Sequence, residues 1–119
     1  MNIEALWAVQ FTAANGVRMA KSGGVIVIES GRIFGGDTWM WYTGRYERDV
    51  KTGKLTCSLE TGVHFNEGGQ SIFGGPLQGR RYVGEIVVAE DQRTARADLV
   101  VEGTTMKLAV TLTWVAPLP

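Results

Sequence analysis

Apolar and polar residues alternate along much of this chain, in short runs separated by turn-forming residues. The longest run covers residues 106–114, where every second side chain is apolar: Met106, Leu108, Val110, Leu112 and Trp114. A period of two places such side chains on one face of a β-strand. Further strands are expected at residues 6–12, 24–29, 32–35, 39–46, 54–61, 82–89 and 94–102. No helical period of meaningful length is present, so the sequence predicts an all-β fold.

The connections between these runs are short and rich in turn formers. They are Asn15-Gly16, Ser30-Gly31, Gly35-Gly36-Asp37, 49–53, 90–93 and Gly103-Thr104. Short turns between consecutive strands make an antiparallel meander. A meander of about eight strands can close and hide its edges. We therefore expect residues 1–119 to form one domain, an up-and-down barrel of lipocalin-like type, with an open sandwich as the alternative.

Residues 39–46 are dense in aromatic side chains on both phases of the expected strand. Trp39 and Trp41 share one phase, and Met40, Tyr42 and Tyr46 share the other. Because both phases are bulky, the sequence leaves open which of them faces inward. The predicted cavity-lining residues are Trp7, Val9, Phe11, Trp41, Leu108, Val110 and Trp114. The predicted face for self-association is Met40, Tyr42 and Tyr46, since exposed apolar patches mark interfaces.

Two segments lack a clear strand pattern. Residues 17–22 are ambiguous and are interpreted as a hairpin loop. Residues 62–81 are glycine-rich and long for a loop, which is typical of functional or mobile segments. This segment is a candidate lid, and Ile72 and Phe73 are candidates to plug an open end of the barrel.

Candidate catalytic residues are few. His64 is the only histidine, with Glu67 as its nearest candidate partner, and Cys57 is the only cysteine. A general base needs an oriented partner, and a metal needs several ligands at suitable spacing. An enzyme using His64 or Cys57 is a weak alternative, so we expect no catalysis, no metal and no cofactor. Cys57 is interpreted as a small buried hydrophobe.

Composition narrows the classes of partner. Twelve basic and twelve acidic residues cancel, so no charge excess favours nucleic acid or an anionic membrane. A single cysteine fits a reducing cytoplasm, and no signal peptide or apolar membrane-spanning run is visible. We expect a cytoplasmic protein that binds neither nucleic acid directly nor a membrane.

Several short motifs, taken in order, resemble the GrlR family of negative regulators of type III secretion. They are Leu6-Trp7 with Val9 and Phe11, Glu29-Ser30-Gly31-Arg32-Ile33, Gly35-Gly36-Asp37, Trp41-Tyr42 with Gly44 and Tyr46, Ser71-Ile72-Phe73-Gly74, and the apolar last strand. The resemblance covers nearly the whole length. It implies a lipocalin-like barrel with an apolar cavity, a homodimer, and repression by sequestering a helix-turn-helix transcription activator.

The resemblance also implies a run of acidic residues on a surface loop or strand end that contacts the activator, as in the best-known member of that family. The nearest equivalent here is residues 46–51, with Glu47, Arg48 and Asp49 as the candidate partner-binding residues. Arg48 and Lys51 interrupt the negative charge there, and Glu90-Asp91 is a second candidate. Two functions follow as hypotheses: a regulator that binds a transcription activator, or a barrel that binds a small apolar, lipid-like ligand.

Overall fold

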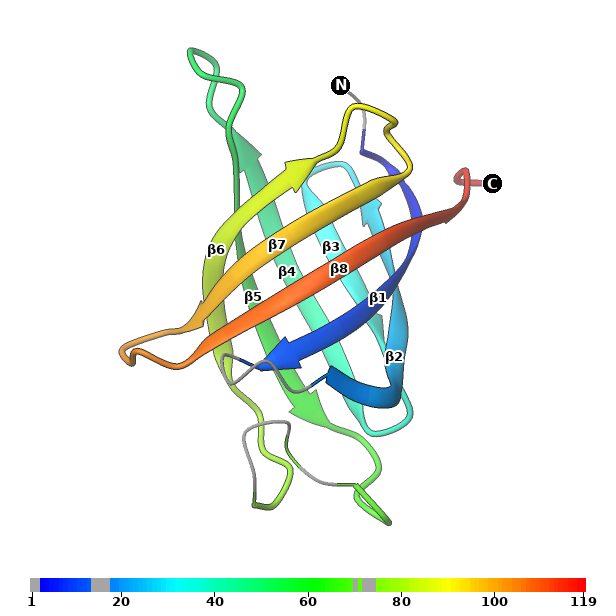
Figure 1. Cartoon of the computed structure of the whole chain (residues 1–119), viewed down its shortest axis with the longest axis vertical. Helices are drawn as coiled ribbons and strands as arrows, with labels where there is room; N and C mark the ends of the chain where they lie inside the picture. The colour runs from blue at the N-terminus through cyan, green and yellow to red at the C-terminus, as the bar shows by residue number, and fades with distance from the viewer. Residues whose placement is uncertain (1–2, 14–17, 70, 72–74) are drawn as a thin grey trace.

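The structure is a computed structural model, and it describes residues 3–13, 18–69, 71 and 75–119. Eight strands follow one another along the chain (Figure 1). They are β1 (Ala5–Ala13), β2 (Arg18–Glu29), β3 (Arg32–Gly36), β4 (Met40–Arg48), β5 (Leu55–Val63), β6 (Arg81–Val88), β7 (Thr94–Val101) and β8 (Lys107–Ala116). The described residues contain no helix, and so none that is long and apolar enough to cross a membrane.

Each strand pairs antiparallel with the next, and β8 pairs back onto β1, which closes the sheet into a barrel. In this seam Ala8 lies beside Thr113, and Val9 lies beside Leu112. The predicted eight-stranded antiparallel up-and-down barrel is therefore confirmed. Closure leaves no strand of the sheet without a neighbour on each side.

Strand β2 begins earlier than the sequence pattern indicated. It starts at Arg18, so the interpretation of residues 17–22 as a hairpin loop is wrong from Arg18 onward. Thr12 pairs with Arg18 across a register shift between Gln10 and Thr12. An irregularity of this kind disturbs the alternation that marks a strand, which explains why the pattern was missed.

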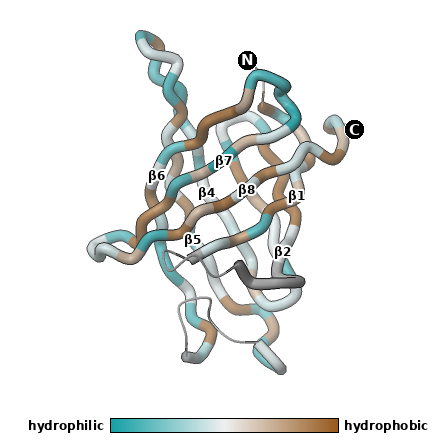
Figure 2. Tube along the Cα trace, in the orientation of Figure 1, coloured by the Kyte–Doolittle hydropathy of each residue, from teal (hydrophilic) through white to brown (hydrophobic). Residues whose placement is uncertain are grey.

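The barrel interior is apolar because the inward position of nearly every strand carries a hydrophobic side chain. Figure 2 shows hydrophobic and hydrophilic segments interleaved over all the strands. The buried core comprises Ile3, Ala5, Trp7, Val9, Ile26, Ile28, Ile33, Tyr42, Leu55, Cys57, Tyr82, Ile86, Ala95, Ala97, Leu99, Val101, Leu108, Val110 and Leu112. No polar or charged residue is buried among the described residues.

A large aromatic side chain, Trp7, packs inside the barrel near the start of β1. Trp7 is only 2% exposed there, and its indole N–H donates to the carbonyl oxygen of Ile3 at 2.9 Å. The hydrogen bond satisfies the polar edge of a large buried ring. The ring therefore fills part of the barrel interior beside the start of β1.

Candidate functional site

A cavity of about 120 Å³ lies inside the barrel and extends toward Trp39, Leu77 and Gln78. Its body is lined by apolar side chains, among them Phe11, Met40, Leu59, Leu108 and Val110. Leu77 and Gln78, from the segment before β6, line its mouth. An apolar space with a few polar groups at one end is the usual form of a small-molecule site.

Asp37 organises one side of the mouth. It follows the glycine pair at the end of β3, and its Oδ1 accepts from the backbone N–H groups of Trp39 at 2.8 Å and Met40 at 2.7 Å. The Tyr42 hydroxyl donates to its Oδ2. Burial, followed by the hydrogen bond to Asp37, raises the pKa of Tyr42 well above its usual range. The phenol therefore stays protonated and remains the donor in this pair.

Tyr82 supplies a second hydroxyl to the cavity from β6. The residue is 8% exposed, and burial raises the pKa of its phenol, with the nearby Arg80 opposing the rise. Within the described part of the chain, its hydroxyl has no hydrogen-bond partner. No described side-chain oxygen is fully buried without a partner, so this hydroxyl remains accessible and can bind a polar ligand atom or a water molecule.

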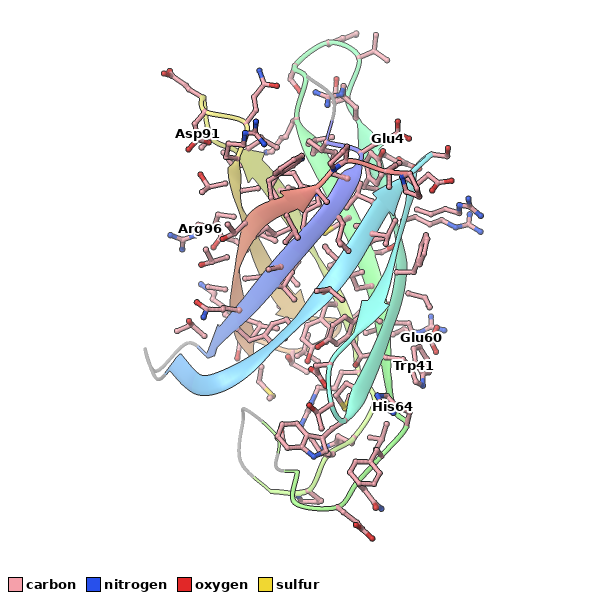
Figure 3. All side chains as sticks on the ribbon, turned by 90° about the vertical axis from the view of Figure 1, so that its right-hand side faces the viewer. Glu4, Trp41, Glu60, His64, Asp91 and Arg96 are labelled. Carbon is pink, nitrogen blue, oxygen red and sulfur yellow. The ribbon has the colours of Figure 1, made fainter. Side chains whose placement is uncertain are left out.

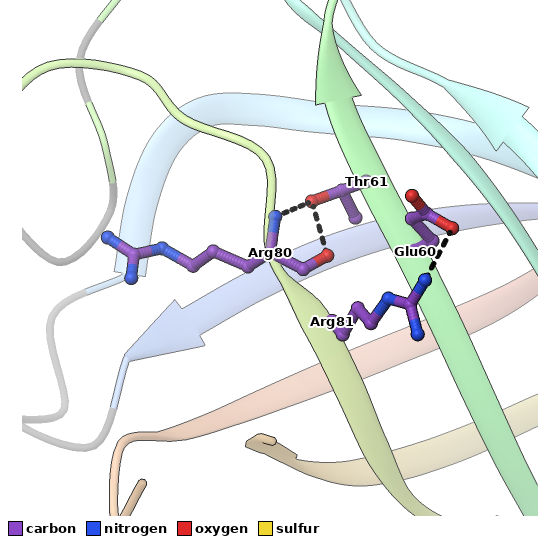
Figure 4. A network of polar contacts seen from close by, with 4 residues as sticks. All are labelled: Glu60, Thr61, Arg80 and Arg81. Carbon is purple, nitrogen blue, oxygen red and sulfur yellow. Dashed lines mark hydrogen bonds and ion pairs between the residues drawn. The ribbon is translucent and has the colours of Figure 1, made fainter. Parts of the chain in front are cut away.

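Arg80 is positioned by Thr61 (Figure 4). The Arg80 backbone N–H donates to the Thr61 hydroxyl oxygen at 3.1 Å, and the Thr61 hydroxyl and backbone N–H both interact with the Arg80 carbonyl, at 3.2 and 2.9 Å. Arg80 lines the cavity, whereas the next residue, Arg81, reaches Glu60 on the outer surface at 3.8 Å. These contacts anchor the returning chain at the mouth.

Other parts of the loop are anchored beside Asp37. His64 binds the Asp37 carbonyl oxygen through Nε2 at 2.9 Å, and its backbone N–H donates to the Trp39 carbonyl at 2.8 Å. The Trp39 indole N–H donates to the carbonyl oxygen of Glu67 at 3.0 Å. His64 thus acts as a loop anchor, and the Glu67 carboxylate is not its partner. Ile72 and Phe73, the predicted plug, lie outside the described residues.

The predicted cavity-lining set is partly correct. Val9, Phe11, Leu108 and Val110 line the cavity. Trp7 is buried in the core and Trp114 is partly buried against it, but neither residue lines the space. The guanidinium of Arg93 lies 4.1 Å from the centre of the Trp114 ring, as in a cation–π pair.

The prediction that Trp41 lines the cavity is wrong. Trp41 is 37% exposed and lies at the outer surface of β4 (Figure 3). Its inward neighbours on the strand are the residues predicted as a dimer face. Tyr42 is buried, and Met40 and Tyr46 pack against the core, so this prediction is also wrong. Trp39 lies just before β4, so it belongs to neither face of that strand. It lines the cavity mouth.

The predicted partner-binding residues lie where β4 leads into a hairpin that projects beyond the rest of the barrel (Figure 1). Asp49 accepts from the backbone N–H groups of Lys51 at 2.8 Å and Thr52 at 3.2 Å, and these bonds lower its pKa. Arg48 binds the Gly53 carbonyl at 3.3 Å. Asp49 and Arg48 therefore stabilise the hairpin itself, and Glu47 is exposed beside them.

Cys57 faces the cavity and is buried. Burial raises the pKa of its thiol to about 11, so it carries little thiolate at neutral pH. The described residues hold no group of three or more histidine, cysteine, aspartate or glutamate side chains that could bind a metal. The arrangement is suited to binding a molecule.

Sequence reasoning missed three residues at the polar end of the cavity: Asp37, Arg80 and Tyr82. Asp37 was recognised only as a turn former, and Tyr82 as part of an alternating run. The alternation of residues 82–88 carried the available signal, because it placed Tyr82 in phase with Ile86, which also lines the cavity.

Comparisons with known proteins do not assign the chain to a family. No protein-family model matches the chain, and no curated protein matches it.

Proposed function

We propose that this protein is a non-catalytic, cytoplasmic regulator that acts by binding another protein. The resemblance to the GrlR family motivates the proposal, with a helix-turn-helix transcription activator as the partner. The observation that carries it is the projecting β4–β5 hairpin. Val50 at its tip is 98% exposed, within a turn that Asp49 holds in shape. An ordered turn that presents an apolar side chain between charged residues is suited to contact a protein surface.

The hairpin offers a specific contact surface. Among the described residues, Glu47 has no ion-pair partner, so its carboxylate is available to a basic partner. Lys54 at the base of the hairpin pairs with Glu85 of β6 at 2.8 Å, which ties the hairpin to the barrel. Such a surface meets its partner with a preorganised shape and loses less conformational entropy on binding.

The proposal is tested by purifying the tagged protein from its own host and identifying co-purifying proteins by native mass spectrometry. The test variant combines Glu47→Lys with Val50→Asp. The control is Glu102→Lys, a charge reversal at an exposed position just after β7. We expect a stoichiometric DNA-binding protein with the wild type and the control, and its loss with the hairpin variant. Equal recovery with all three proteins would reject the hairpin as the contact surface.

We further propose that the protein forms a homodimer through the outer face of β2–β4. The residues Val25, Gly36, Trp41 and Gly62 are successive partners across four strands, and Phe34 lies in the adjacent row. Val25, Phe34 and Trp41 are exposed. Analytical ultracentrifugation of Phe34→Glu should show a monomer where the wild type is a dimer. A monomeric wild type would reject this assignment.

A second candidate function is the binding of a small apolar ligand, and the cavity favours it. About 120 Å³ of space persists in an apolar interior, although Trp7 is packed inside the same barrel. Well-packed protein interiors contain few voids larger than a water molecule. Native mass spectrometry of the same host-purified protein tests this function as well, since a bound ligand would appear as a small added mass on the barrel.

A further inference from the structure

We propose that the cavity binds a single-ring aromatic molecule that carries one hydroxyl group, with the ring in the apolar body and the hydroxyl against Tyr82. This inference rests on the second candidate function, ligand binding, and names its chemical class. A single-ring aromatic ligand takes the place of the lipid-like ligand that was expected from the sequence. Three observations carry it: the size of the space, the nature of its walls and the state of its polar groups.

The size of the cavity limits the ligand. Pockets that bury drug-sized molecules usually measure about 300–1,000 Å³. A void of about 150 Å³ engineered into another protein binds benzene. The present cavity, at about 120 Å³, lies close to that benzene-sized space. A long acyl chain requires more room than this, whereas one six-membered ring fits after small shifts of the lining side chains.

The walls of the cavity suit an aromatic ring. Phe11 and Tyr42 meet edge to face there, with centroids 5.6 Å apart and planes at 76°. Aromatic rings favour edge-to-face and offset contacts with one another, beyond the area that they bury. Met40 also lines the space, and a thioether adapts to an irregular gap and contacts ring edges favourably.

The polar groups at the mouth differ in what they can still bind. The Tyr42 hydroxyl donates to Asp37, which also accepts two backbone N–H groups. Within the described part of the chain, the Tyr82 hydroxyl has no such partner, although its ring is buried and lines the cavity. A ligand hydroxyl can both accept from Tyr82 and donate to it. Tyr82 is therefore the group that would distinguish a phenol from a plain hydrocarbon.

The experiment compares three probes by NMR titration of the purified protein: p-cresol, toluene and laurate. We expect p-cresol to bind, with shifts at the methyl groups of Leu108 and Val110, about 2- to 12-fold more tightly than toluene, the range expected for one net hydrogen bond. Tyr82→Phe should remove this difference. Tyr46→Phe is the matched control, because it deletes one phenol oxygen outside the cavity lining and should leave the difference unchanged.

Ala97→Leu adds bulk to the cavity wall and should abolish binding of p-cresol, with thermal unfolding recorded to show that the variant folds. Equal binding of p-cresol and toluene to the wild type would overturn the role of Tyr82. Binding of laurate without binding of either ring would overturn the single-ring class and leave the ligand-binding function standing. If no probe shifts the lining residues, both the inference and the second candidate function fail.

Discussion

The indole of Trp41 lies directly over Gly62, its cross-strand partner on β5. A Cβ atom at residue 62 would lie 2.2 Å from Cζ2 of the ring, so the ring occupies the space of the missing side chain. An aromatic side chain that covers a glycine on the neighbouring strand stabilises the sheet at that point. This contact accounts for a tryptophan on the outer surface of a barrel whose interior is apolar.

Gly62→Ala should displace the Trp41 ring at a small cost. The clashing atoms are at the far end of a side chain that can rotate, so we expect a loss of about 1 kcal/mol in the free energy of unfolding, with a change in tryptophan fluorescence. Gly44→Ala is the contrasting variant. Its Cβ would lie 2.1 Å from the Ser58 carbonyl oxygen, which belongs to the backbone, and the expected loss is about 3 kcal/mol or more. Urea denaturation measures both, and equal losses would contradict this explanation.

Trp7→Phe should destabilise the core beside the start of β1. The change removes the donor to the Ile3 carbonyl oxygen and leaves a small void in a region that is almost wholly buried. The expected loss is about 2–4 kcal/mol in the free energy of unfolding. Trp41→Phe is the control on the outer surface and should cost clearly less. A loss for Trp7→Phe no larger than that of the control would show that the buried hydrogen bond contributes little.

Stability should fall at alkaline pH because of Cys57. Its pKa in the folded protein, about 11, is above its ordinary value, so the unfolded chain loses the thiol proton first. The stabilisation of the folded state by the neutral, buried thiol is fully present below about pH 8.5 and is lost as the pH rises through about 11. Between pH 8 and 10.5 the wild type should lose about 1–2 kcal/mol more than Cys57→Ala. Urea denaturation of both proteins at both pH values measures this difference. Tyr42 and Tyr82 contribute equally to both proteins, so their effects cancel in the comparison. A constant difference between the two proteins would reject the buried-thiol explanation.

Arg93→Ala should weaken the packing of Trp114 at the barrel end. The guanidinium stacks on the indole at 4.1 Å, and an exposed cation–π pair contributes about 0.5–1 kcal/mol. Arg96→Ala is the control, because its guanidinium forms a surface ion pair with Asp98 at 2.9 Å, and such pairs contribute little. Unfolding followed by tryptophan fluorescence should show a loss for Arg93→Ala only. A similar loss for both variants would indicate a general effect of removing arginine.

The sequence predicted the barrel because one face of most strands is buried, and burial enforces a period of two. The runs at residues 6–12 and 106–114 illustrate this, since their alternation matches β1 and β8. For residues 39–46, the wrong side chains were predicted to face the barrel interior, and the reason is physical. Both phases are bulky, and the inward side was decided by contacts with other strands: Trp41 with Gly62, and Tyr42 with Phe11 and Asp37.

The residues at the polar end of the cavity could not be predicted from the sequence for a related reason. Asp37, Arg80 and Tyr82 come from a turn, a loop end and a strand, and only the closed sheet brings them to one space. Thr61 determines where the loop returns, through a side chain that looks like any other strand threonine. Local patterns identify strands, whereas the meeting of distant segments depends on register and closure.

The seam between β1 and β8 has a consequence for how this chain reaches its native state. Ala8 and Thr113 are neighbours in space but lie near opposite ends of the sequence, so their pairing raises the contact order and slows folding. During synthesis on a ribosome, β1 and β7 have one unpaired edge each until residues 107–116 have emerged. Unpaired edges recruit other strands. The nascent chain therefore remains prone to aggregation until β8 has paired with both β7 and β1.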